Sequence, residues 1–229
     1  EGQTLQEGDP ISIYSACNIS ELDLSGCAHC ALKVDLSRIN SDSVGNSLKK
    51  LIVSGNNNAL DDTTFIGTDK LTRLEYLDVQ GLHKLGSLNV SNSLNLKTLL
   101  AKDTGLTSVK LAPGCLIERL ELPTATAALI LEDLPLLNKD GLDIEGDWQN
   151  VWKIKISGCP NLTNDFDLIW NWYNKTSQSE VRSLELYDIL WANVDIDNLI
   201  QLVQNTNVIF KGKIHLKNVS DKTKLLKLN

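Results

Sequence analysis

The residues with the clearest potential for chemistry are Cys27, His29 and Cys30, which stand close together in the sequence Cys-Ala-His-Cys. This spacing is typical of half a structural zinc site, and such a site needs four ligands in a tetrahedral arrangement. The sequence lacks a second Cys/His pair of this kind. The total of five Cys is odd, and their scattered positions make a poor disulfide framework. We therefore expect no metal ion and no disulfide network.

The three histidines, His29, His83 and His215, lie far apart in the chain. No Gly-rich phosphate loop follows a predicted strand, and neither a paired-carboxylate motif nor a nucleophile elbow is present. If the fold is a stack of repeats, contacts join only neighbouring coils, so distant histidines cannot assemble a catalytic triad. We expect no catalytic residue and no cofactor, and therefore no enzyme activity.

Composition bounds the partners that the chain can have. The 229 residues carry a formal net charge of −7, and 42% of them are hydrophobic. A negative surface argues against binding to nucleic acid, and a hydrophobic content of this size is enough to build a core. No run of 18 apolar residues occurs, so we expect no membrane-spanning helix.

A repeat between residues 74 and 131 predicts the strands that would position any functional residue. Pairs of apolar residues separated by one position recur at intervals of nine to eleven residues, and every second pair counted from Leu77 recurs after 22 and then 21 residues. Each pair predicts a short strand with one apolar face. The pairs are Leu77/Val79, Leu88/Val90, Leu99/Ala101, Val109/Leu111, Leu120/Leu122 and Leu129/Leu131.

This period predicts a β-rich solenoid with few helices, built from stacked coils of about 21–30 residues. One coil cannot bury its own row of Leu side chains, but neighbouring coils bury each other's rows. Successive strands should form a parallel sheet on the concave side of the stack. The half-turn of about 11 residues favours short extended segments on the other side, because it leaves no room for an ordinary helix.

The solenoid is expected to occupy residues 17–217 as a single domain. Residues 1–16 are interpreted as a linker that leads into a first strand, and residues 218–229 as a C-terminal tail. Apolar residues at helical spacing predict helices at 164–175 and 195–204. These helices would back the last coils and cover the exposed end of the core.

The turn that follows a strand also has a pattern. Cys27, Asn56 and Cys159 are expected to turn inward there and to satisfy buried backbone groups. The shared Ser-Gly-Cys motif places the strand around Ile154 on the same sheet as Leu22. Strict alternation from Leu77 predicts the opposite side for Ile154, and only one of these two assignments can be right.

The segments SELDLSGC, KKLIVSGN and WKIKISGC share the pattern of a strand followed by a tight turn. In these segments the chain resembles the leucine-rich-repeat superfamily. More narrowly, it looks like the short-coil repeats of bacterial cell-surface proteins and of phage virion proteins. The resemblance implies a non-enzymatic display or adhesion scaffold, located at a bacterial surface or outside the cell, or alternatively in a phage virion.

We therefore expect a protein–protein interaction or adhesion module that binds through its concave sheet. Strand residues between and after the inward Leu pairs should project from that sheet and contact the partner. The candidate partner-binding residues are Asp78, Gln80, Leu100, Lys102, Lys155, Glu185, Tyr187 and Trp172.

Two alternatives stay open. The chain could be a structural spacer in a surface or virion fibre that assembles with copies of itself. It could also bind a host or surface glycan through aromatic stacking, since all five Trp lie between positions 148 and 191. The candidates are Trp148, Trp152, Trp172 and Trp191, and the helical position of Trp172, away from the main apolar stripe, predicts that it is exposed.

Overall fold

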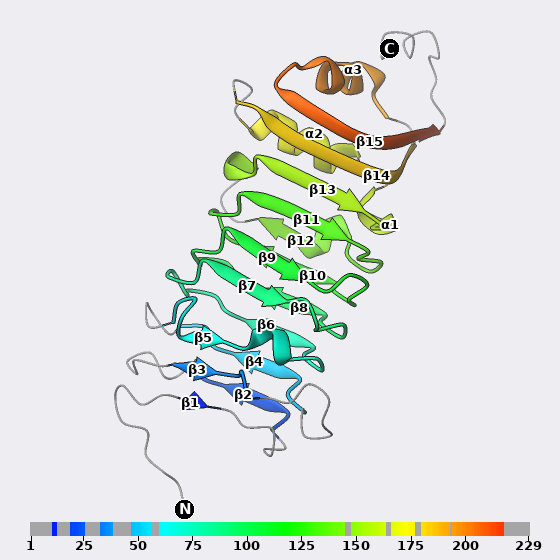
Figure 1. Cartoon of the computed structure of the whole chain (residues 1–229). Helices are drawn as coiled ribbons and strands as arrows, with labels where there is room; N and C mark the ends of the chain where they lie inside the picture. The colour runs from blue at the N-terminus through cyan, green and yellow to red at the C-terminus, as the bar shows by residue number, and fades with distance from the viewer. Residues whose placement is uncertain are drawn as a thin grey trace, which may run out of the picture.

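The computed structural model of the chain is β-rich, with parallel sheets and few helices. It describes residues 11–12, 19–25, 33–38, 47–55, 60–144, 148–163, 166–176, 180–192 and 194–217. Up to residue 144 the strands lie in two layers, and beyond it only one layer of strands continues (Figure 1). One layer is a six-stranded sheet, and the other, the opposite row, consists of three shorter sheets.

The six-stranded sheet takes alternate strands of the chain, all of them parallel. Its middle positions pair in register from Leu22 through Leu77 to Leu142. From Leu77 to Leu142 the paired residues are 21 or 22 apart, in agreement with the predicted period, whereas the two earlier steps, from Leu22 to Leu51 and to Leu77, are 29 and 26 residues. Its strands are β2 (Glu21–Asp23), β4 (Lys50–Ile52), β6 (Tyr76–Asp78), β8 (Thr98–Leu100), β10 (Arg119–Leu122) and β12 (Leu142–Ile144).

The opposite row holds the strands in between, which confirms that the other half of each turn is extended rather than helical. It has two interruptions in its hydrogen bonding, so it divides into sheets of three, two and four strands. The first is β1 (Ile11–Ser12), β3 (Val34–Asp35) and β5 (Phe65–Ile66), and the second is β7 (Ser87–Val90) and β9 (Ser108–Leu111). The third is β11 (Ala128–Glu132), β13 (Lys153–Ser157), β14 (Arg182–Ala192) and β15 (Val208–Lys217).

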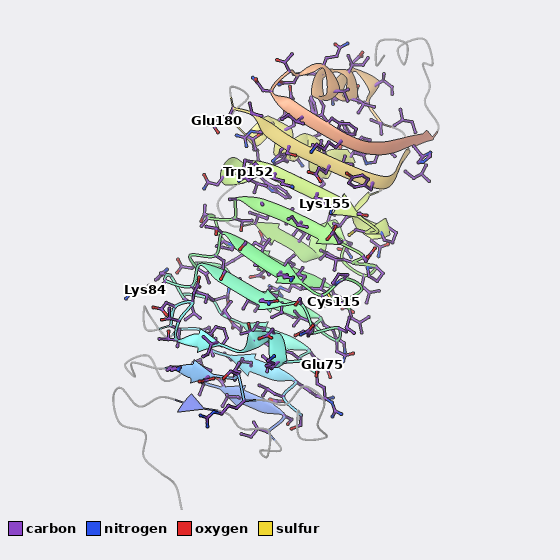
Figure 2. All side chains as sticks on the ribbon, in the orientation of Figure 1. Glu75, Lys84, Cys115, Trp152, Lys155 and Glu180 are labelled. Carbon is purple, nitrogen blue, oxygen red and sulfur yellow. The ribbon has the colours of Figure 1, made fainter. Side chains whose placement is uncertain are left out.

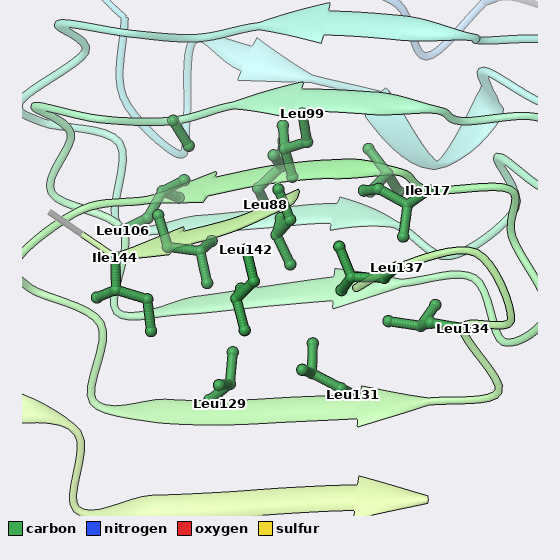
Figure 3. Packing of buried hydrophobic residues seen from close by; sticks show 14 of the residues in the cluster. Leu88, Leu99, Leu106, Ile117, Leu129, Leu131, Leu134, Leu137, Leu142 and Ile144 are labelled. Atoms are coloured by element: carbon green, nitrogen blue, oxygen red, sulfur yellow. The ribbon is translucent and has the colours of Figure 1, made fainter. Parts of the chain in front are cut away.

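The core is the layer of aliphatic side chains between the two rows. Figure 3 shows Leu99 and Leu142 from the six-stranded sheet meeting Leu88, Leu129 and Leu131 from the opposite row. Each of these five side chains is at least 92% buried. Alternation along each strand sends these residues inward and their neighbours outward, as the Leu-x-Leu pattern predicts.

Tight turns end the strands by a device that recurs along the chain. The side chain of Asp23, of Asp78 and of Asn89 each accepts a hydrogen bond from the backbone N–H two residues later, at 2.9, 3.0 and 3.1 Å. Such a side chain holds the chain in a turn after the strand. Gly55 and Gly81 then adopt positive φ angles of 74° and 77°, which glycine tolerates best.

At the C-terminal end, helices take the place of the six-stranded sheet. After β12 the chain forms α1 (Pro160–Thr163) and α2 (Phe166–Lys175) between β13 and β14, and α3 (Ile196–Gln204) between β14 and β15. The predicted helices at 164–175 and 195–204 are confirmed within the described residues. Both cover the inner side of the last strands (Figure 1). Three short 3₁₀ helices complete the elements: η1 (Thr68–Lys70), η2 (Lys139–Gly141) and η3 (Trp148–Asn150).

The assignment of Ile154 to the sheet of Leu22 is wrong, and strict alternation is right. Strand β13, which contains Ile154, pairs with β11 and β14 in the opposite row. The Ser-Gly-Cys motif does not determine the row, because it specifies only a turn after a strand, and turns of this kind follow strands in both rows. Gly158 in the opposite row has a positive φ of 63°, like Gly55 in the other.

Candidate binding face

The candidate site is the outward side of the six-stranded sheet, which we call the sheet face. It consists of the side chains on either side of the inward Leu ladder. One column contains Lys50, Tyr76, Thr98 and Arg119, and the other contains Ile52, Asp78, Leu100, Glu121 and Asp143. In-register parallel pairing holds these side chains at neighbouring positions, so the face is ordered by the backbone itself.

The middle of the sheet face is apolar and aromatic. Ile52 and Leu100 are half-buried and flank Asp78 in the cross-strand register. Tyr76 is also half-buried, and the Lys50 ammonium lies 5.7 Å from the centre of its ring, a cation–π distance. Burial, with the carboxylate of Asp78 nearby, raises the pKa of Tyr76. Its hydroxyl is protonated at neutral pH, as that of an ordinary tyrosine is, and can donate a hydrogen bond.

A charged network lies beside this centre. Glu121 accepts a hydrogen bond from Arg119 Nε at 2.8 Å and lies 3.8 Å from the Lys102 ammonium. Lys102 also pairs with Asp143 at 2.5 Å. Glu121 is only 5% exposed although it projects outward, and its hydrogen bond and charge raise the pKa of Arg119. The pairing fixes long side chains in place before any partner arrives.

Another ion-pair group borders the face where its strands begin. Glu75 lies between Lys49 and Lys97, with nitrogen–oxygen distances of 3.0 and 3.3 Å. Hydrogen bonds from these two lysines, Lys49 first, lower the pKa of the Glu75 carboxyl. The pairs are partly exposed, so they contribute orientation and solubility more than stability.

Four predicted residues lie on or next to this face: Asp78, Gln80, Leu100 and Lys102. Leu100 and Lys102 have the accessible outward positions that were expected. Asp78 does not, because it is 9% exposed and its carboxylate holds the turn by accepting the Gln80 N–H. The prediction missed Tyr76 and Arg119, which precede the inward Leu. Their outward parity was readable from the same alternation, but only the positions after the first Leu were considered.

Three other predicted residues lie on the opposite row, so the eight do not form one surface. Lys155 is on β13 and forms an ion pair with Glu132, while Glu185 is on β14 and pairs with Lys153 at 3.2 Å. Tyr187, also on β14, is 36% exposed. Figure 2 shows Lys155 on this row. The misplacement results directly from the wrong assignment of the strand around Ile154.

The prediction that Trp172 is exposed is wrong. Its side chain is completely buried, and its indole Nε1 donates a hydrogen bond to the Val151 carbonyl at 2.8 Å. Helix α2 packs against both η3 and α3. A helix with neighbours on two sides buries a wider stripe than its main apolar face, so the angle of Trp172 did not report exposure.

The other three candidate tryptophans differ in their exposure. Trp191 is 1% exposed and packs edge-on against Phe166, with ring centres 4.9 Å apart. Trp152 is 49% exposed where β13 begins (Figure 2), and Trp148 is half-buried in η3. Trp148 lines a cleft of about 480 Å³ between η2 and α2, together with Asp140 and Asn171.

The described part of the chain offers no candidate for metal or thiol chemistry. Among its residues no group of three His, Cys, Asp or Glu side chains is placed to hold a metal ion. Cys115 and Cys159 are free thiols in the core, and burial raises both pKa values, that of Cys159 to about 11. Cys159 turns inward and its Sγ donates to the Ser157 carbonyl at 3.3 Å, as expected for its turn. The positions Cys27, His29, Cys30 and Asn56 lie outside the described residues.

The helices in the described ranges are all too short or too polar to cross a lipid bilayer. Comparison of the chain with protein-family models, with curated proteins and with solved structures finds no match.

Proposed function

We propose that the chain is a short-coil leucine-rich-repeat solenoid that binds a protein partner through its sheet face. It would serve as a non-catalytic interaction or adhesion module, at a bacterial surface as the resemblance implies. Three features support the solenoid: the 21–22-residue period, the in-register Leu ladder and the alternation of strands between two rows.

The observation that carries the binding proposal is the half-buried centre of Tyr76, Ile52 and Leu100 within a border of paired charges. Binding energy at interfaces concentrates in a few aromatic, apolar and Arg side chains that become fully desolvated. Charged groups around such a centre exclude wrong partners and steer the right one. Because the strands and ion pairs are already ordered, little conformational entropy is lost on binding.

The face also indicates the chemistry of the partner. Arg119 is exposed even though it bonds Glu121, and Lys102 bridges two carboxylates, so neither cation is an unsatisfied charge. A complementary partner would therefore present a broad surface with an apolar centre and polar groups of both signs at its edge, rather than one strongly charged patch.

The test is a comparison of two variants in pull-downs from surface extracts of candidate host bacteria. The double variant Tyr76→Ala/Leu100→Ala removes the centre of the sheet face. The control Val181→Ser/Ile209→Ser changes two residues outside the sheet face, one just before β14 and one on β15, that are 63% and 49% exposed. A partner retained by wild type and control but lost by the first variant supports the proposal. Equal retention by all three would reject the sheet face as the binding surface. Self-association without a foreign partner would reject the proposal and favour the fibre-spacer alternative.

A second candidate function is glycan binding in the cleft beside Trp148. The cleft combines an aromatic side chain with the exposed Asp140 and Asn171, and such planar polar groups can hydrogen-bond sugar hydroxyls. The variant Asn171→Ala should abolish glycan-array signals while Trp152→Ala, at an exposed site outside the cleft, leaves them unchanged. An array without signals for the wild type rules this candidate out.

A further inference from the structure

The opposite row is interrupted between β9 and β11, which are consecutive strands of that row but belong to different sheets. The strands are still tied near both ends, where Ala127 N donates to Thr107 O at 3.4 Å and Gly114 N donates to Asp133 O at 2.8 Å. The β9 side has one residue more than the β11 side between these bonds. Pro113, next to the second bond, has no N–H to continue the ladder. The interruption is thus a local separation within a stack that remains connected.

The separation opens the core to the surface. Inward residues of the adjacent strands β7 and β11 are covered, since Leu88 is 3% exposed and Leu129 is 2% exposed. The inward residues of β9, Val109 and Leu111, are only partly buried, because β11 does not close over them. Above them lies a groove of about 470 Å³, and Ile130 on its other side is 44% exposed. Only about 10 Å³ remains between the strands themselves, roughly the space of one water molecule.

The border of the groove is polar and carries a cation. Ser108, Asn89 and Lys110 line it from β9 and β7, and all three are exposed. Lys110 has no ion-pair partner among the residues that the structure describes. Glu132, the acidic residue on the far side, is already paired with Lys155. The groove therefore has an apolar floor, hydrogen-bonding side chains and one positive charge with no ion-pair partner among the described residues.

We infer that this groove is a second docking site, for an extended peptide segment of a partner protein in which an aliphatic residue stands next to a carboxylate. Adjacent side chains of an extended peptide point to opposite sides. The aliphatic side chain would enter the gap over Val109 and Leu111, and the neighbouring carboxylate would reach Lys110. Ser108 and Asn89 would hydrogen-bond the peptide amides. The space between the strands is too small for a whole strand, so the peptide lies over the gap and does not insert into the sheet.

The site is independent of the sheet face, because it lies on the opposite row and uses other residues. Its test uses the full chain labelled with ¹⁵N and the acetylated, amidated pentapeptide Thr-Leu-Asp-Leu-Thr as probe. The expected result is a saturable set of NMR shifts confined to residues 87–89, 107–113 and 128–132. A peptide with Ser in place of both Leu, and one with Lys in place of Asp, should bind at least about tenfold more weakly.

Matched variants are available on the same row. Lys110→Glu and Ile130→Thr should each weaken binding of the probe, the first by about tenfold through charge reversal. Lys211→Glu and Ile209→Thr change the same residue types at exposed positions of β15 and should leave binding unchanged. The Lys110→Glu variant should also prefer the Lys-containing peptide over the Asp-containing one.

Three results would overturn the inference. The first is the absence of saturable shifts in the wild type. The second is equal binding by Lys110→Glu and Lys211→Glu. The third is displacement of the peptide by dodecanoate with no effect of the peptide's Asp, which would identify the groove as a site for an aliphatic chain instead. If the probe peptide binds in the groove but no partner binds to the sheet face, only the proposed function is rejected.

Discussion

Single residues at the turns carry much of the geometry of this molecule. Gly67 and Gly81 both have positive φ, 81° and 77°, but their surroundings differ. A Cβ on Gly67 would lie 2.2 Å from the Ser37 nitrogen, whereas the nearest atom to one on Gly81 would be 3.8 Å away. Substitution of Gly81 therefore tests backbone strain alone, whereas substitution of Gly67 tests backbone strain together with steric overlap.

Substitution of these two glycines gives the first prediction. Gly81→Ala should lower the free energy of unfolding by about 1 kcal/mol, the cost of a side chain in the left-handed region. Gly67→Ala should lower it by roughly 2–4 kcal/mol, because overlap with the chain at Ser37 adds to that cost. Urea unfolding of both variants measures the difference. Equal losses would show that the close approach of Gly67 to the preceding coil is not rigid.

The Asp61 carboxylate gives a prediction about pH. It accepts hydrogen bonds from the Thr63 hydroxyl at 2.7 Å, the Thr63 N–H at 2.8 Å and the Thr64 hydroxyl at 2.9 Å. These bonds, led by the Thr63 hydroxyl, lower the pKa of Asp61 from 3.8 to about 2. A lowered folded-state pKa means that the stabilisation is complete above the unfolded value and is lost as the pH falls toward the folded value.

The loss of stability in Asp61→Ala should therefore be constant above about pH 5 and should shrink steadily between pH 4 and pH 2. Urea unfolding of wild type and variant at several pH values measures it. An NMR titration of the Asp61 carboxyl should give a midpoint near 2. A midpoint near 4, or a stability difference that does not change with pH, would contradict the hydrogen-bonding account.

At the scale of elements, the strands between Leu77 and Leu131 were predictable because their signal is local and repeated. Alternation decides which side chains point inward, and the period decides which strands become neighbours. The row that contains Ile154 required a correct count over the whole repeat, which a turn motif cannot supply. The burial of Trp172 depends on η3, a neighbour that the periodicity of α2 does not encode. The same limit hid the groove, since the separation of β9 from β11 arises from their mutual geometry.

Helix α3 shows how strongly a cap contributes to one element. The Asp195 side chain accepts hydrogen bonds from the N–H groups of Asp197 and Asn198, at 2.9 and 3.3 Å. Asp195→Ala should lower stability by about 1 kcal/mol and speed hydrogen exchange in α3, because these two donors lose their partner. Asp195→Asn keeps the acceptor and should stay within about 0.5 kcal/mol of wild type. Equal effects of both substitutions would assign the role to charge instead of capping.

At the scale of the whole molecule, the two rows of strands differ in how they connect the N-terminal and C-terminal parts. Where the opposite row is interrupted between β9 and β11, the six-stranded sheet continues, since β10 pairs with both β8 and β12. Where contacts join only neighbouring strands, cooperativity depends on the weakest interface. Strand β10 therefore supplies the continuous hydrogen-bonded pairing between the parts of the molecule on either side of this interruption, and it keeps the sheet face continuous.

This division predicts different behaviour for two equivalent core substitutions. Leu99 and Leu120 occupy matching positions of the Leu ladder and are 0% and 1% exposed, so Leu99→Ala and Leu120→Ala should each cost about 3 kcal/mol. They differ in the opposite row, which is continuous from β7 to β9 beside Leu99 and interrupted from β9 to β11 beside Leu120. All five Trp lie between positions 148 and 191, so fluorescence reports on the C-terminal part while circular dichroism reports on the whole chain. The two signals should unfold together in urea for wild type and Leu99→Ala. For Leu120→Ala they should separate, because the substitution weakens the one row that is continuous across the interruption. Coincident unfolding curves for Leu120→Ala would show that the contacts around the groove couple the N-terminal and C-terminal parts even when the Leu120 side chain is removed.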